Sequence, residues 1–533
     1  MDNRLRTNFP NQIIDIKYQY ECLWKQHKLD NRLQMEAFWF STKLPQNRPL
    51  NRLIPRVTLR GGFIEQYRLK FTEIENPGWK IYFADVNSLY SHIAMTNVFP
   101  LGKYQILLSK DNLKDNITFV NGQFFYKGQS MQGDAAHVKL LAPARLFRPF
   151  LGYRVNDEFN FLGLCKMCMI EKRAVHCTHK AENSRYFTSC YQVTDLAKAV
   201  ELGYEILEWY ELHHYTEHDL ILKDFIQILG AQKLRHSDIY SNMTEAKRTE
   251  TADYINKAMS LTGNLQVTES SLNLAQKQLF KDMMNSFFGR FALHTNYTHH
   301  YFCRNLFEIQ KHAQKSNAEI KDILAITEDT CQLEVSEPSK IKPSQNGCLY
   351  ITSEINALAR KFIYEKSELI DKANGIVIAI DTDSIIYALP PDQADVLTYS
   401  SAFGDFKHVL GFDSTIKSVY SLGPRNYSIT YLDKNGCENH MLKVKGLSTT
   451  SINNCDTITP NIYQEFLEKR FEDEFTSIYL PQMRKKFEKQ TYKFHEILTK
   501  FNFGNEIHTK RFVVNKDSSY TTYPYGYKWC KKY

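Results

Sequence analysis

The chain has 533 residues, of which 43% are hydrophobic and 24% charged, and its formal net charge is +8. This composition is typical of an ordinary globular protein and permits a nucleic-acid partner without requiring one. No apolar stretch reaches the roughly 18–20 residues of a membrane helix, and the N-terminus lacks the apolar core of a secretory signal. Eleven cysteines, an odd number in a long chain, predict a reducing intracellular compartment, nuclear or cytoplasmic, and no disulfide framework.

Residues 1–78 form an N-terminal segment whose clearest feature is a pair of glycines. Tyr18–Trp24 reads as a strand that runs into a helix, and Gly61 and Gly62 follow an apolar segment. For most glycine pairs a simple turn is a sufficient explanation.

Residues 79–102 contain an apolar strand, Ile81–Ala84, that ends in an aspartate, Asp85. The run reads as a strand that ends in an acid. The segment continues through the four residues Val86, Ser88, Leu89 and Tyr90.

Residues 103–215 carry a cysteine pattern. Cys165 and Cys168 are separated by two residues, and Cys177 and His179 by one. Three cysteines and a histidine supply the four ligands of a structural zinc ion. The alternative is a set of scattered buried thiols, and the close spacing favours zinc.

Residues 216–296 read as two antiparallel helices, the first including Lys223–Leu234 and the second Ser271–Phe291. Three residues of the second helix share one face by their spacing of four and three; they are Lys281, Asn285 and Phe288. Lys233 on the first helix is a weaker candidate for a phosphate contact, because most helical lysines are simply solvated.

Residues 297–345 are polar and read as a small irregular insertion, after which Gly347–Ile363 reads as a helix. Two β-branched runs, Ile376–Ile380 and Ile385–Leu389, then predict a hairpin with Asp381 and Asp383 at its tip. Residues two apart on a strand share a face, so the two carboxylates would repel each other unless a cation lay between them. Hard oxygen ligands in low number favour Mg²⁺, although an acidic hairpin turn is the simpler alternative.

The remaining residues are rich in basic side chains beside aromatic ones. Arg425 and Tyr427 lie in LGPRNY, and Lys443 and Lys445 lie in LKVKG. Basic residues beside an aromatic ring suit a nucleic-acid backbone, and the alternative is a basic hairpin that faces water. In the last segment, Arg484–Lys486 and Lys489 predict a basic helix for duplex phosphates.

Three segments, KIYFADVNSLY, KDMMNSFFG and GIVIAIDTDSIIYAL, occur in the order of motifs A, B and C of family B DNA polymerases, which they resemble. The resemblance implies an α+β right-hand fold, in which an antiparallel palm sheet is joined by helical fingers and a thumb. The sequence departs from the family pattern at four positions, which are Ser91, Phe288, Ala379 and Arg425.

The resemblance also implies roles for the candidate residues. Asp85, the carbonyl of Val86, Asp381 and Asp383 would hold two Mg²⁺ ions. The incoming triphosphate would be bound by Ser88, Leu89, Lys281 and Lys233, and the nascent base pair by Asn285 and Phe288. Tyr90 would act as a steric gate against ribonucleotides. The primer and template would be contacted by Gly61, Gly62, Arg425, Tyr427, Lys443 and Lys445.

A more specific resemblance is to the protein-primed polymerases of Maverick/Polinton transposons and related viruses or organelles. There a glycine-pair motif precedes motif A, and a cysteine-histidine segment follows it; Phe63 replaces the arginine of that glycine motif. The resemblance implies a terminal priming protein as a partner. The family also carries a 3′–5′ exonuclease ahead of motif A, and the 78 residues here are too few to hold it. We therefore expect a polymerase without proofreading, a subunit that works with a separate exonuclease, or a truncated relative.

These inferences predict a DNA-directed DNA polymerase that uses two Mg²⁺ ions and one structural Zn²⁺, with primer-template DNA and dNTPs as partners. The first alternative is a degenerate copy that binds DNA without catalysis, and the second is a reverse transcriptase, which shares a paired-aspartate hairpin but lacks motif B.

The expected divisions are the N-terminal segment (1–78), a first palm segment with motif A (79–102), the zinc-bearing insertion that resembles the first terminal-protein region (103–215), fingers (216–296), a small insertion (297–345), a second palm segment with motif C (346–450) and the thumb (451–533).

Overall fold

The computed structural model describes residues 52–155, 159–173, 176–180, 184–292, 298–313, 319–325, 330–336, 348–445, 460–469, 476–488, 491–503, 510–513 and 520–528. The predicted elements at Tyr18–Trp24 and the predicted contribution of Lys489 lie outside these residues. The described chain forms two compact units. The larger unit takes in the described parts of Leu53–Ala292, Cys348–Leu480 and Thr499–Tyr533, and the smaller those of Met1–Arg52, Leu293–Gly347 and Pro481–Leu498.

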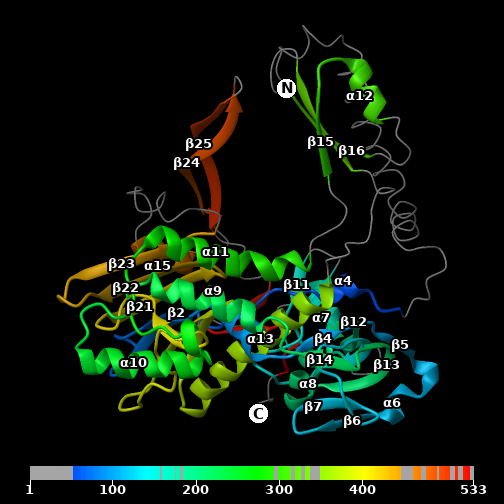
Figure 1. The fold of residues 1–533 in the computed structure, drawn as a ribbon, viewed down its shortest axis with the longest axis horizontal. Helices are drawn as coiled ribbons and strands as arrows, with labels where there is room; N and C mark the ends of the chain where they lie inside the picture. The colour runs from blue at the N-terminus through cyan, green and yellow to red at the C-terminus, as the bar shows by residue number, and fades with distance from the viewer. Residues whose placement is uncertain are drawn as a thin grey trace. The chain divides into compact units, whose positions relative to one another are not determined.

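The larger unit is organised around an antiparallel sheet of nine strands, with the order β1-β18-β19-β3-β21-β22-β23; β2 pairs with β21, and β20 pairs with β3. Figure 1 shows β21, β22 and β23 side by side. The strands are β1 (Ile64–Gln66), β2 (Lys70–Thr72), β3 (Lys80–Val86), β18 (Ile376–Asp381), β19 (Ser384–Leu389), β20 (Phe406–His408), β21 (Thr415–Gly423), β22 (Asn426–Leu432) and β23 (Glu438–Lys443).

The centre of this sheet is the predicted acidic hairpin. β18 and β19 pair antiparallel, with Asp381 opposite Ser384, and β19 then pairs with β3, which places Ser384 opposite Asp85. Every residue of β19 is buried, which is why the run is apolar from Ile385 to Leu389 without alternation. One face of the sheet is covered by α13 (Leu349–Lys372), which extends beyond the helix expected from the sequence. The α+β fold class is confirmed.

The segment between motif A and residue 216 folds into a mixed module. Its four-stranded sheet has the order β12-β9-β13-β5, and it also contains a three-stranded sheet, β6-β7-β8, and the pairs β10-β11 and β14-β4. Its elements, with the short helices that flank it, are α4 (Pro55–Thr58), α5 (Leu89–Thr96), β4 (Phe99–Leu101), β5 (Gln105–Leu108), α6 (Leu113–Asn116), β6 (Ile117–Val120), β7 (Gln123–Tyr126), β8 (Gln129–Ser130), β9 (Ala135–Leu141), β10 (Tyr153–Val155), β11 (Phe159–Phe161), α7 (Lys166–Glu171), β12 (Phe187–Gln192), α8 (Val193–Glu201), β13 (Glu205–His214) and β14 (Glu217–Asp219).

Two antiparallel helices, α9 (Lys223–Arg235) and α11 (Leu274–Arg290), form the pair expected from the sequence. The start of α11 lies beside the end of α9, because the Asn273 amide donates to the carbonyl of His236. The Asn273 side chain caps α11 by accepting from the Gln276 amide, so the helix begins three residues after Ser271. A third helix, α10 (Glu245–Ala258), lies between the two in the sequence and was not predicted.

The smaller unit contains a folded module where the sequence led us to expect irregular structure, and that expectation is wrong for the described residues. β15 (Thr298–Cys303), β17 (Cys331–Ser336) and β16 (Glu319–Ala325) form a sheet in that order, and α12 (Leu306–Ala313) contacts β15 and β17. The module has a small core because Cys331, Leu333 and Val335 alternate inward on β17.

The C-terminal region contains α15 (Pro460–Lys469), which contacts β21 and β22, and the strand pairs β24 (Thr476–Glu488) with β25 (Thr491–Phe503) and β26 (Arg511–Val513) with β27 (Thr522–Pro524). The predicted basic helix is wrong, because Arg484–Lys486 lie in β24. Alternating aromatic residues in the paired β25, such as Tyr492 and Phe494, favour strand pairing over the helix that the basic run suggested. Among the described helices, none has the length and apolarity needed to cross a membrane.

Candidate active site and metal centre

The acidic hairpin brings Asp383 beside Asp85. Thr382 and Asp383 form the two-residue turn, with Thr382 at φ 64°, and the Val86 amide donates to the Asp383 carbonyl at 2.8 Å. Burial, and after it the nearby charge of Asp85, raises the pKa of Asp383 to about 6. The two carboxylates therefore repel each other, which is the situation that a bound cation relieves.

Asp381 has different partners from Asp383. Its two carboxylate oxygens accept from Arg425 Nε at 2.9 Å and from Lys443 Nζ at 3.0 Å. The expectation that Asp381 and Asp383 form one pair on a strand face is thus corrected, because Asp383 lies in the turn and not in the strand. Of the two neighbouring acids, Asp85, from another strand, raises the pKa of Asp383 more than Asp381 does.

Oxygen ligands from Asp85 and Asp383 fit a hard divalent cation such as Mg²⁺, which takes few protein ligands and completes its shell with water and phosphate. Within the described residues, the one group of three or more acidic, cysteine or histidine ligands gathered within 4.8 Å is the cysteine-histidine cluster. The three aspartates are not gathered as tightly as that.

Lys407 is part of this site, although no sequence motif pointed to it. It lies on β20, which pairs with β3 so that Lys407 stands opposite Asp85. Its Nζ lies 2.6 Å from Asp85 Oδ1. A three-residue strand has no periodicity from which its partner can be inferred, so no pattern could have identified Lys407.

Motifs A and B meet through their aromatic rings. Tyr90, at the start of α5, stacks on Phe288 of α11 with ring centroids 4.9 Å apart and planes inclined by 3°. Lys281 and Asn285 are exposed on α11. The side chains of Val86 and Leu89 are buried, so only their backbone is available to a ligand.

Lys233 reaches from α9 to motif A, where its Nζ donates to Ser88 Oγ at 2.7 Å. Burial, and then the charges of Lys407, Lys281 and Lys277, lower the pKa of Lys233 to about 8. Lys233, Lys277 and Lys281 thus place positive charge near the motif A loop, which suits a polyphosphate anion.

The glycine pair supports the acidic hairpin. The Thr382 amide donates to the Phe63 carbonyl at 2.6 Å, and a Cβ added to Gly62 would lie 2.9 Å from the Thr382 methyl group. Phe63, which replaces the arginine of the family motif, is 3% exposed and packs on Phe150 and Tyr364. The pair therefore has a packing role that the sequence did not indicate.

The predicted DNA contacts on β22 and β23 differ in exposure. Tyr427 is 3% exposed, so its ring is not available for stacking on a base. Lys443 lies over that ring at 5.6 Å, and Lys445 is exposed at the end of the described segment.

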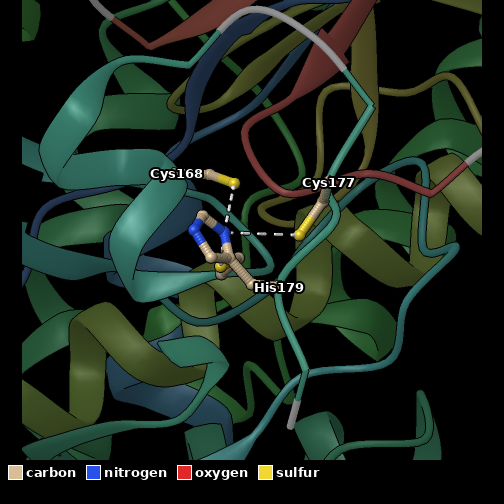
Figure 2. A group of neighbouring side chains, drawn as sticks. Cys168, Cys177 and His179 are labelled. Carbon is tan, nitrogen blue, oxygen red and sulfur yellow. Dashed lines mark hydrogen bonds between the residues drawn. The ribbon is translucent and has the colours of Figure 1, made fainter. Parts of the chain in front are cut away.

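The four predicted zinc ligands come together. The Sγ atoms of Cys165, Cys168 and Cys177 lie 3.5, 3.3 and 3.8 Å from His179 Nδ1, and Figure 2 shows the sulfur atoms of Cys168 and Cys177 directed at the imidazole. Two ligands of a tetrahedral zinc ion, with Zn–S near 2.3 Å and Zn–N near 2.0 Å, lie about 3.5 Å apart. Hydrogen bonds from Cys165 and Cys168 hold the pKa of the Cys177 thiol below its ordinary value. The cluster therefore fits zinc in both geometry and chemistry.

Hydrogen bonds join the segment that carries this cluster to Tyr525 and Lys528, near the end of the described residues. The Leu164 amide donates to the Tyr525 carbonyl at 2.7 Å, and Lys528 Nζ donates to the His179 carbonyl at 3.0 Å. Gly526 has φ +89°, and a Cβ there would lie 2.5 Å from the Cys165 Cβ. A side chain at Gly526 would thus collide with Cys165 of the cluster.

Comparison with known proteins gives a family for a portion of the chain. Residues 54–247 match the model of a family described as DNA polymerase type B, organellar and viral. No curated protein sequence matches the chain.

Several solved structures resemble the chain. Phi29 DNA polymerase complexed with primer-template DNA and incoming nucleotides is 15% identical, with a TM-score of 0.48, over 84% of this chain and 62% of that one. Its complex with primer-template DNA alone has a TM-score of 0.46 at the same identity and coverage. The family B polymerase of the archaeon Pyrobaculum calidifontis is 10% identical, with a TM-score of 0.24, over 90% of this chain and 44% of that one. The chain thus spans less than two thirds of the length of the phi29 enzyme.

Proposed function

Because residues 54–247 match the organellar and viral type B DNA polymerase family, we propose that this chain is a DNA-directed DNA polymerase. It would add dNTPs to a primer 3′-hydroxyl under the direction of a template. The observation that carries this proposal is the meeting of three distant segments: Asp85 of motif A lies beside Asp383 of motif C, and Tyr90 of motif A stacks on Phe288 of motif B. Motifs B and C lie outside the matched residues, so the geometry supports the proposal independently of that match.

Phosphoryl transfer depends on positioning and charge neutralisation. Asp85 and Asp383 would hold the Mg²⁺ ions, with Asp381 as the third acid of the site. When bound, such ions lower the barrier by activating the primer hydroxyl and neutralising charge on the phosphates.

The lysines and rings have separate tasks. Lys281 and Lys233 would bind the triphosphate, and the Lys233 hydrogen bond to Ser88 orients its ammonium toward the motif A loop. The Tyr90 ring is held by its stack on Phe288. It would exclude a ribose 2′-hydroxyl by filling the space beside the sugar. Asn285 and Phe288 would pack on the nascent base pair.

Two finer elements of the proposal rest on the motifs alone: the two-ion mechanism and the use of a priming protein. The Cys165, Cys168, Cys177 and His179 cluster would hold a structural Zn²⁺, which its distances support. Primer-template DNA and dNTPs are the proposed ligands.

The second candidate function is DNA binding without catalysis. It is favoured by the ion pairs that Lys407, Arg425 and Lys443 make with Asp85 and Asp381, since these neutralise the acids without any metal. It leaves unexplained why Asp383 is held beside Asp85, where it repels that acid.

Primer extension separates the two candidates. Wild-type protein with Mg²⁺, dNTPs and a labelled primed DNA template should lengthen the primer. Asp85→Asn should still bind the same template, as measured by fluorescence anisotropy, but should add no nucleotide. An RNA template tests the reverse transcriptase alternative in the same gel. Wild-type protein that binds the template and adds no nucleotide would support the DNA-binding alternative.

A further inference from the structure

A short segment after motif C places the ammonium group of Lys407 against the carboxylate of Asp85. β20 pairs with β3 along Phe406–His408, and Lys407 stands directly opposite Asp85. The Lys407 Nζ lies 2.6 Å from Asp85 Oδ1, with 56% of the lysine side chain and 24% of the aspartate side chain exposed. The ammonium can therefore leave the carboxylate for solvent without any change in the backbone.

The backbone of this segment is fixed by motif A. The Asn87 amide donates to the Asp405 carbonyl at 2.8 Å, the Gly404 amide donates to the Asn87 carbonyl at 3.0 Å, and Asn87 Nδ2 donates to the Ser400 carbonyl at 2.6 Å. Lys407 thus enters the site from a strand whose backbone is hydrogen-bonded to motif A.

The fingers also contact the segment. The Tyr254 hydroxyl on α10 donates to Asp405 Oδ2 at 2.6 Å, and Lys233 Nζ lies 4.8 Å from the centre of the Phe403 ring. The charged groups that face Lys407 are Asp85, Asp383 and Lys233. Two of the three are acids that a divalent cation would also bind.

We propose that Lys407 is the resident counter-ion of Asp85 and that a divalent cation must displace its ammonium to bind there. Lys407 is a positioning residue in this scheme: it keeps Asp85 neutralised and in place before the cation arrives, and it sets the cation affinity. The inference rests on the proposed function, because it requires Asp85 to be a metal ligand. An ammonium and a divalent cation compete for the same carboxylate oxygen, so removal of the ammonium must tighten cation binding.

The test is direct Mn²⁺ binding, measured by electron paramagnetic resonance on the zinc-loaded protein without DNA or nucleotide. Exposed ion pairs contribute little, so Lys407→Gln should tighten Mn²⁺ binding by roughly two- to fivefold. Lys407→Arg should bind Mn²⁺ as wild type does. Lys417→Gln is the matched control, because Lys417, on the neighbouring strand β21, makes a 2.6 Å ion pair with Glu73. Its Mn²⁺ affinity should not change.

The direction of the effect separates this role from a structural one, since a damaged site would bind Mn²⁺ more weakly. Unchanged or weaker Mn²⁺ binding in Lys407→Gln, with wild-type thermal stability, would overturn the inference. Asp85→Asn distinguishes this failure from failure of the proposed function. If Asp85→Asn loses Mn²⁺ binding while Lys407→Gln does not gain it, only the counter-ion role is wrong; if Asp85→Asn binds Mn²⁺ like wild type, the metal assignment itself is wrong.

Discussion

The packing of the glycine pair under the acidic hairpin can be tested with two adjacent substitutions. Gly62→Ala would place a Cβ 2.9 Å from the Thr382 methyl group and 3.2 Å from its Cα, whereas a Cβ on Gly61 would meet nothing within 4 Å. Neither glycine has a positive φ, so the difference between the two variants is steric.

The size of the effect follows from these distances. Non-bonded carbon atoms pack at about 3.5–4.0 Å, so the Thr382 turn must move by roughly 0.6 Å or more. Such overpacking costs about 1–3 kcal/mol of folding free energy. A displacement approaching 1 Å at a reacting centre can lower a rate by about 100-fold, so we expect Gly62→Ala to lose about 10- to 100-fold in nucleotide addition. Gly61→Ala should leave the rate and the stability close to wild type.

The assay is single-nucleotide addition under single-turnover conditions, together with thermal unfolding and template affinity. Thr382→Ser removes the methyl group that Gly62→Ala would strike, so the double variant should recover a fraction of the lost rate. Equal rates for Gly61→Ala and Gly62→Ala would refute the packing role. Equal losses of template affinity in both variants would favour the template contact that the motif resemblance implies.

Three further predictions concern the zinc cluster and the charged groups of the site. Gly526→Ala should weaken zinc retention, because its Cβ would strike Cys165; zinc measured by elemental analysis after chelator dialysis should fall well below the wild-type content, and equal content would contradict the contact. Asp383 has a pKa of about 6 and must be ionised to bind a cation, so Mn²⁺ affinity should fall by up to about tenfold per pH unit below pH 6. If the Mn²⁺ affinity stays unchanged down to pH 5, Asp383 does not bind the ion. Lys233 loses its charge as the pH rises through about 8, so dNTP binding should weaken above pH 8 and should be accompanied by proton uptake near pH 8. Calorimetry in two buffers of different ionisation enthalpy measures this proton uptake. If wild-type protein takes up no proton on dNTP binding, Lys233 is excluded as a phosphate contact.

Local features of the site could be predicted because they depend on short-range patterns. The β-branched runs around Asp381 and Asp383 predicted the hairpin, and both strands form as expected. The spacing of Cys165, Cys168, Cys177 and His179 predicted one cluster, and their ligand atoms all lie within 4.8 Å of one another. In each case the residues that must meet are close in the sequence.

Features that depend on long-range pairing could not be predicted. Lys407 reaches Asp85 only through the register of a three-residue strand, and Arg425 reaches Asp381 across the sheet. The pairing of β24 with β25 replaces a helix that the basic run alone suggested. The contact of Gly526 with Cys165 joins residues more than three hundred positions apart, and no local pattern marks it.

The central claim, that Asp383 takes part in metal-dependent nucleotide addition, is tested most directly by rapid-quench measurement of one dNTP added to a primed template. Asp433→Asn is the control, because Asp433 is an acid at the exposed turn between β22 and β23. With Mg²⁺ present, we expect wild type and Asp433→Asn to add the complementary nucleotide at equal rates. Asp383→Asn should lose at least about 1,000-fold in rate, since loss of a metal ligand removes several kcal/mol of transition-state stabilisation, while it still binds the template. Addition by Asp383→Asn at the rate of Asp433→Asn would contradict the account.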